Sequence, residues 1–279
     1  MFSKVFAAAI VLASVSAHAA DSEFFFQSKA GQSDLTPRIG YVSTKTKPKG
    51  GTTETKYSGL YKSGVSYEYG INEMFSIEGS LLFSSYENDN TPKTKVSGLE
   101  DPHVVLKGTS NMGSSNLRYG LDLGLSLQKA KIETNGDMSA ATGGFSFTPY
   151  VGMDTEAAGG TIGGRLNYAV LLERTTEVEA LNMDVKTKDG NTLGLSAFYE
   201  TTVTDVLFGG SLNYYNHAAL NDEDGNELIK SYNTLGLSLY SRIPFGTWAL
   251  IPRLDYDFSH SEADTYNVIA LSAAARFTF

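Results

Sequence analysis

Few residues of this 279-residue chain could do chemistry, because it contains no cysteine and only four histidines. Thiol nucleophiles, disulfides and thiolate metal sites are therefore excluded. His103, His217 and His260 follow the first 20 residues, and no Gly-x-Ser-x-Gly nucleophile motif accompanies them. Residues 221–227 gather acidic and amide oxygens around Gly225, but they lack the spacing of a calcium-binding loop and favour a solvated acidic turn. The sequence predicts no catalytic residues, no cofactor and no metal site.

The charge balance excludes a further class of partner. The chain has 22 Lys and Arg against 31 Asp and Glu, a formal net charge of −9. Proteins that hold nucleic acid phosphates need a basic excess, so nucleic acid is not a predicted partner. Four lysines, Lys45, Lys47, Lys49 and Lys56, gather in one predicted loop, where they suit lipid phosphates or serve only to keep the loop soluble.

The first 19 residues have the three parts of a secretory signal peptide. Lys4 precedes an almost wholly apolar run at residues 5–15, and small residues at 17 and 19 suit cleavage. The run is too short to cross a membrane as a helix, and no later run approaches the roughly 20 residues required. We therefore expect residues 1–19 to be removed on export, and no membrane-spanning helix.

The rest of the chain alternates with period two. Leu117, Tyr119, Leu121 and Leu123, for example, alternate with small or charged residues, which helical spacing does not explain. Five short and six generally longer polar connections separate the alternating segments. The segments are residues 36–46, 57–71, 75–86, 98–110, 116–131, 142–155, 161–175, 190–202, 206–219, 228–244, 248–260 and 266–279.

About twelve strands joined by alternating short and long links predict an all-β fold, a transmembrane antiparallel up-and-down β-barrel with periplasmic N- and C-termini. We expect residues 20–34 to form an N-terminal periplasmic or lumen-associated segment and residues 35–279 to form the barrel. A soluble barrel also alternates, but its apolar face points inward. Here the other parity carries Gly, Ser, Asn and charges of both signs, and aromatic residues lie near the strand ends, as a membrane girdle requires.

The last strand ends with Phe277 and Phe279 on the apolar parity. A terminal aromatic that closes an alternating strand resembles the assembly signal of bacterial outer-membrane proteins, which the barrel-assembly machinery would read. The sequence therefore predicts a monomer in the bacterial outer membrane, surrounded by lipid and lipopolysaccharide.

Charged residues on the lumen parity recur a few positions from the predicted periplasmic turns. They are Arg38, Glu68, Glu78, Lys107, Arg118, Asp122, Arg165, Glu200, Arg242, Arg253, Asp255 and Arg276. Because both signs are interleaved, we expect a mixed-charge constriction in the periplasmic half of the lumen and not a single-sign funnel for acidic sugars. A salt-bridge network that only stiffens the wall is the alternative.

Two stretches resemble the outer-membrane barrels of the MetA-pathway-of-phenol-degradation family. In that family a Tyr-Gly-Leu-Thr-like turn leads into a strand, and residues 69–72 here read Tyr-Gly-Ile-Asn. A Gly-Leu-Gly-Asp-Pro-like segment opens a later strand, and residues 98–102 read Gly-Leu-Glu-Asp-Pro, with Glu100 where Gly is usual. The resemblance implies an outer-membrane channel for small organic solutes, without catalytic residues.

The favoured function is thus a porin-like channel for passive diffusion of small solutes. One alternative is a closed barrel with a structural or surface-interaction role. A second is a lipid-modifying enzyme like the outer-membrane phospholipases, for which His260, at the extracellular end of its strand, would face the lipid.

Overall fold

The structure of the chain is a computed structural model, which describes residues 24–90 and 93–279. The expected signal peptide, residues 1–19, lies outside the described residues. No helix within the described part of the chain is long and apolar enough to cross a membrane.

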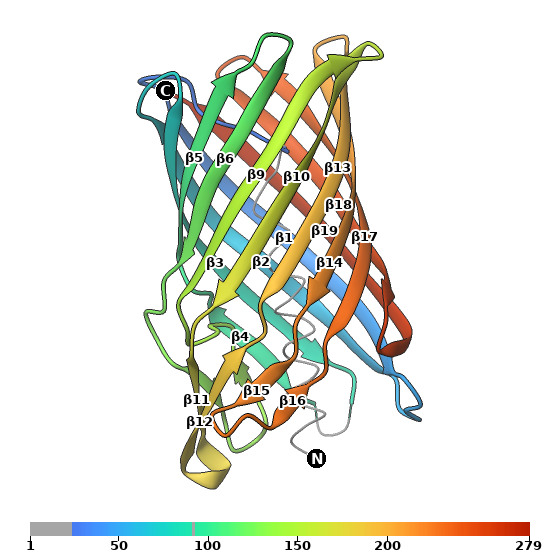
Figure 1. The fold of residues 1–279 in the computed structure, drawn as a ribbon. Helices are drawn as coiled ribbons and strands as arrows, with labels where there is room; N and C mark the ends of the chain where they lie inside the picture. The colour runs from blue at the N-terminus through green and yellow to red at the C-terminus, as the bar shows by residue number, and fades with distance from the viewer. Residues whose placement is uncertain (1–23, 91–92) are drawn as a thin grey trace.

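Twelve long strands pair in antiparallel order around a closed barrel, as the sequence predicts (Figure 1). The last of them pairs with the first, which closes the sheet and leaves no free edge. The barrel strands are β1 (Ser33–Pro48), β2 (Thr55–Gly70), β3 (Phe75–Asn88), β5 (His103–Asn111), β6 (Ser115–Gly124), β9 (Ser146–Ala157), β10 (Gly160–Leu171), β13 (Thr192–Val203), β14 (Val206–His217), β17 (Tyr232–Phe245), β18 (Trp248–His260) and β19 (Ala263–Thr278).

The first and last strands meet at one rim of the barrel. The amide of Ser33 donates to the carbonyl of Phe279, and the amide of Phe279 donates back to the carbonyl of Ser33. Short turns join the strands at this rim, which is the periplasmic side. Aromatic rings cover its outer surface, because Trp248 stacks on Phe245 at 4.5 Å and lies 6.1 Å from the ring of Phe277. Such rings are typical of the membrane interface.

Neighbouring residues on one strand have opposite environments. Leu212, Leu239 and Ile269 are 52%, 48% and 43% exposed on the outer face, where lipid covers them. Beside them along the chain, Ser211, Ser238 and Val268 are 4%, 2% and 1% exposed because they point into the lumen. An apolar outer face and a largely polar inner face are the arrangement that a bilayer demands. The predicted parity is therefore confirmed, and the protein is an outer-membrane barrel.

Seven short strands extend the sheet at the opposite, extracellular end (Figure 1). Some turn into the mouth, where Ile132, Met138 and Val178 pack against wall residues such as Tyr86 and Val268 in one buried apolar cluster. The outer half of the lumen is thus filled partly by its own loops. The short strands are β4 (Lys95–Leu99), β7 (Ala130–Ile132), β8 (Met138–Ser139), β11 (Arg174–Val178), β12 (Met183–Asp189), β15 (Leu220–Asp222) and β16 (Glu227–Ile229).

Some strand boundaries differ from the predicted ones, and Pro102 explains two of the differences. The expected strand 98–110 divides into β4 and β5 around Pro102, which has no N–H to donate to a ladder. The expected strand 116–131 ends at Gly124, opposite His103, the first residue of β5. Leu125 then donates to the carbonyl of Pro102 and the chain leaves the wall. The alternating leucines continue to Leu127, but the neighbouring strand β5 offers no residue beyond His103 with which they could pair.

Candidate functional site

The periplasmic half of the lumen contains a buried cluster of three charges. The ammonium of Lys107 lies 2.9 Å from a carboxylate oxygen of Glu68 and 2.6 Å from one of Glu78. Glu68 also accepts from the hydroxyl of Ser76 and the backbone N–H of Ser28. Because three strands, β2, β3 and β5, each contribute one charge, the cluster fixes this side of the wall.

The other predicted lumen charges also lie on the inner face, but several have partners that the sequence analysis did not name. Arg118 pairs with Asp154 at 2.6 Å, and Asp122 accepts from Nδ1 of His103 at 2.8 Å. The remaining contacts are Arg253 with Asp255 on the same strand and Glu200 with the hydroxyl of Tyr240. Arg38 and Arg242 lie opposite inward residues of the neighbouring strands, Gly64 and Leu207. That this set governs permeation stays a prediction.

The segment before β1 crosses the lumen at the level of these charges. The chain passes the rim at Ala30, which bridges to Gly70, and its residue Phe26 lies over Arg276 with 3.3 Å between guanidinium carbon and ring centroid. Phe25 lies 5.9 Å from Arg118, and Phe24 lies 5.3 Å from Arg165. Three consecutive phenylalanines therefore each rest on a cation of the wall, which is a favourable electrostatic contact with the ring face.

Phe24 reaches the far wall. Its ring stacks on Phe198 with centroids 4.1 Å apart, and its N–H points to Glu200 at 3.4 Å. Phe24, Phe198 and Tyr240 form a buried apolar cluster, with Phe25 and Leu207 packed against it. We call residues Phe24–Ser28 the lumen segment. No period in the sequence reveals its position, because the segment lies outside every strand, and three adjacent Phe give the only signal.

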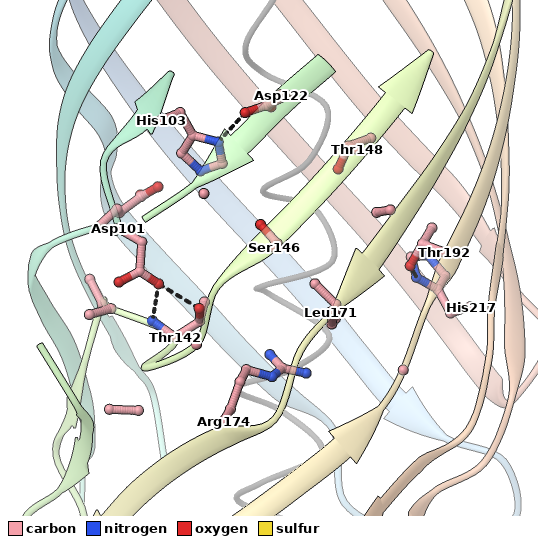
Figure 2. Close-up of a pocket in the computed structure, with 18 of the residues that line it drawn as sticks. Asp101, His103, Asp122, Thr142, Ser146, Thr148, Leu171, Arg174, Thr192 and His217 are labelled. Carbon is pink, nitrogen blue, oxygen red and sulfur yellow. Dashed lines mark hydrogen bonds and ion pairs between the residues drawn. The ribbon is translucent and has the colours of Figure 1, made fainter. Parts of the chain in front are cut away.

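A cavity of about 300 Å³ lies on the extracellular side of the lumen segment. Aromatic and aliphatic side chains line much of it, including Tyr61, Tyr86, Ile132, Met138, Leu171 and Tyr232. Many polar and charged side chains also line it, and Figure 2 shows two of their pairs, His103 with Asp122 and Asp101 with Thr142. A cavity of this size that combines apolar walls with polar side chains is typical of small-molecule sites.

Arg174, on β11, points into this cavity from the extracellular end (Figure 2). Burial lowers the pKa of its guanidinium, and the nearby charge of Asp101 opposes that shift. Because a guanidinium is a very strong base, the side chain remains charged. The extracellular end of the cavity therefore carries a fixed positive charge.

The alternative of a lipid-modifying enzyme, which required His260 to face the lipid, is wrong about the direction of this side chain. A bulge in β18 opposite Leu235 and Gly236 turns this side chain into the lumen. Its ring stacks on Tyr232 at 4.3 Å and lies 4.9 Å from Tyr266, while His217 stacks on the other side of Tyr232 at 4.4 Å. A histidine inside this column of rings cannot meet a lipid on the outer surface. Period-two parity fails here because the bulge adds a residue.

Lys62 is a further charged residue of the lumen, outside the predicted set because it lies far from the periplasmic ends of the strands. Lys62 lines the cavity, is only 5% exposed, and has the positive φ of 46° that L side chains rarely adopt. No acceptor within hydrogen-bond or ion-pair distance of its ammonium occurs in the described part of the chain.

Together, the closed wall, the lipid-facing apolar belt and the polar lumen define a twelve-stranded outer-membrane β-barrel. No protein-family profile matches the chain, and no curated protein sequence matches it. Its fold is similar to that of the COG4313 outer membrane channel from Pseudomonas putida F1, with a TM-score of 0.76, 10% identity, and coverage of 93% of this chain and 100% of the other.

Two autotransporter barrels are also similar in fold. One is the translocator domain of NalP from Neisseria meningitidis, with a TM-score of 0.61, 13% identity, and coverage of 98% of this chain and 97% of the other. The second is the transport unit of AIDA-I from Escherichia coli, with a TM-score of 0.61, 10% identity, and coverage of 97% of each chain. These likenesses confirm the predicted fold, a closed antiparallel outer-membrane β-barrel.

Proposed function

We propose that this protein is an outer-membrane channel for the passive diffusion of small solutes. The observation that carries the proposal is a cavity of about 300 Å³ inside the barrel, bounded on its periplasmic side by the lumen segment and the charged wall. A solute that enters from outside would meet apolar walls first and the mixed-charge constriction next. The likeness in fold to an outer-membrane channel supports this function.

The lumen segment would be the movable part of the path. Within the described residues it holds to the wall mainly through three cation–π contacts, the Phe24 ring stack and a few hydrogen bonds. A cation–π contact contributes about 0.5–2 kcal/mol, so no single contact locks the segment. The barrel wall, in contrast, is held by continuous strand ladders.

The same contacts favour the second candidate, a closed barrel with a structural or surface role, if the segment never leaves. Ion conductance in a planar bilayer separates the two candidates. The variants are Phe24→Ala, Phe25→Ala and Phe26→Ala combined, and a matched control with three outward phenylalanines, Phe75, Phe83 and Phe147, replaced by Ala. For a channel, we expect wild type to conduct weakly or in bursts, the lumen variant to conduct several-fold more, and the control to match wild type.

Folded protein that conducts no ions, even without the three lumen rings, would exclude the channel and leave the closed barrel. The charged constriction has its own measurement, the reversal potential under a salt gradient. Replacing Arg242 and Arg253 together by Ala removes two cations and should shift the selectivity toward cations. An unchanged reversal potential in the folded variant would show that these charges do not set permeation.

A further inference from the structure

We propose that Lys62 is the anion-binding residue of a ligand site in the cavity, and that the ligand is a small monocarboxylate with an apolar, ring-sized body. The inference deepens the proposed channel function by naming the class of solute. It starts from how β2 departs from regular pairing at this residue.

Strand β2 has a bulge that turns two consecutive side chains into the lumen. Its pairing with β3 moves from Leu60 opposite Ser85 to Ser63 opposite Phe83, so one extra residue of β2 must be accommodated. Tyr61 and Lys62 both become buried, at 4% and 5% exposure. A bulge commonly redirects a side chain next to a functional site.

The bulge has dedicated support on both neighbouring strands. The N–H of Lys62, displaced from the ladder, donates to the hydroxyl of Ser84 at 2.9 Å, and the N–H of Gly40 donates to the hydroxyl of Ser63 at 3.1 Å. A Cβ at Gly40 would lie 2.2 Å from the carbonyl oxygen of Tyr61, so only glycine fits beside the bulge. The backbone at Lys62 is held at φ 46°, in the left-handed region that L residues rarely adopt.

The side chain so placed has no partner of opposite charge in contact. Its ammonium lies 5.6 Å from the centroid of the Tyr61 ring. The hydroxyl of Tyr61 is itself buried without a hydrogen-bond partner. Buried polar groups are almost always satisfied in folded proteins, so unmet donors in a cavity indicate a ligand that supplies acceptors.

The carboxylates of the same cavity are already engaged. Glu100 accepts from Ser84 and attracts Lys62 only from beyond hydrogen-bond distance, Asp122 contacts the ring of His103, and Asp101 accepts twice from Thr142. The second oxygen of Asp101 lacks a hydrogen bond, but it belongs to a group that Arg174 attracts. The unmet demand at the centre of the cavity is therefore for an acceptor with negative charge, and not for a second cation.

The walls define the rest of the ligand. Tyr61, Tyr86 and Ile132 line the same cavity as Lys62, and its volume of about 300 Å³ is at the lower limit of common ligand sites. A body about the size of one ring therefore fits between these apolar side chains and the Lys62 ammonium. An aromatic or short branched monocarboxylate combines the two requirements.

Direct binding to the purified, folded full barrel tests the inference, measured by isothermal titration calorimetry in detergent. The probes are benzoate, its neutral analogue benzyl alcohol, and acetate, which lacks the ring. We expect benzoate to bind most tightly to wild type, and Lys62→Met to weaken benzoate at least about tenfold while leaving benzyl alcohol unchanged, because a charge-assisted hydrogen bond is lost. Lys62→Arg should retain most of the affinity.

The matched control is Lys131→Met. Lys131 lines the same cavity, but its ammonium already pairs with Glu179. If Lys131→Met weakens benzoate as much as Lys62→Met does, the effect is general charge and the assigned site is wrong. If benzoate and benzyl alcohol bind wild type equally, the inference is wrong whether or not the variants fold.

The result is separable from the test of the channel. Conductance without binding that depends on Lys62 would leave the channel and remove the ligand class. Binding that depends on Lys62 without conductance or uptake would leave the ligand site in a barrel that is not a channel.

Discussion

The two halves of the lumen are closed by different forces. In the periplasmic half, Lys107 joins Glu68 and Glu78 in a buried charge cluster, and the lumen segment rests its rings on cations. In the extracellular half, Ile132, Met138 and Val178 fold inward from loops and form an apolar cluster with the wall. Charges buried on the wall must be paired and are costly to disturb, whereas an apolar cluster made by loops can open locally. The barrel therefore has a rigid wall at its periplasmic end, on which the lumen segment is held by weaker contacts, and a yielding extracellular end.

The largest effect should come from breaking the rigid end with Lys107→Met. The substitution leaves Glu68 and Glu78 buried beside each other without their shared cation, and removing one partner of a buried ion pair typically costs 3–5 kcal/mol, so we expect a loss of about that size. Urea unfolding of the refolded barrel in lipid measures it. Lys93→Met, which removes an exposed cation paired with Glu87, is the control and should change stability little.

A fall in the free energy of unfolding of less than about 1 kcal/mol, similar to that for an exposed pair, would show that water or the neighbouring hydroxyls stabilise the two carboxylates without Lys107. The description of the periplasmic end as rigid would then be wrong.

Much of this architecture could be predicted from period two alone. A bilayer allows only closed barrels or helices to cross it, so alternating strands of the right length predict a closed barrel. The residue types of Leu212 and Ser211 then predict that the first faces outward and the second faces the lumen. What could not be predicted depends on departures from the period. Bulges turn Tyr61 and His260 into the lumen against the strand parity, and Pro102 ends pairing that the leucine pattern would continue. The lumen segment has no period at all, so its place follows only from tertiary contacts.

The yielding end should respond to Ile132→Ala. Ile132 is 7% exposed within the apolar cluster. We expect the substitution to lower the free energy of local loop opening by about 2 kcal/mol, at the low end of such truncations, because the adjoining cavity lets the neighbouring side chains relax. The loss should appear as faster hydrogen exchange and proteolysis of β7 and β8, with the unfolding midpoint of the barrel unchanged. A fall in the global midpoint equal to that of Lys107→Met would contradict the distinction between the two ends.

The smallest effect sharpens the comparison at the outermost surface, where Lys131 and Glu179 form an exposed ion pair between β7 and the turn after β11. The hydrogen bond from Lys131 lowers the pKa of the Glu179 carboxyl, and the same bond raises the pKa of the Lys131 ammonium. A lowered carboxyl pKa stabilises the folded loops above the carboxyl's unfolded value and loses that effect as pH falls through the folded value. A raised ammonium pKa contributes below its unfolded value and is lost as pH rises through the folded one. Loop protection in hydrogen exchange, corrected for the intrinsic rate, should therefore be highest between those limits and fall at both extremes.

Glu179→Gln should flatten this pH profile of loop protection while the unfolding midpoint of the barrel stays constant. A profile that keeps its shape in Glu179→Gln would assign the pH dependence to other loop charges, and a midpoint that follows the profile would mean that the extracellular loops and the wall unfold as one unit.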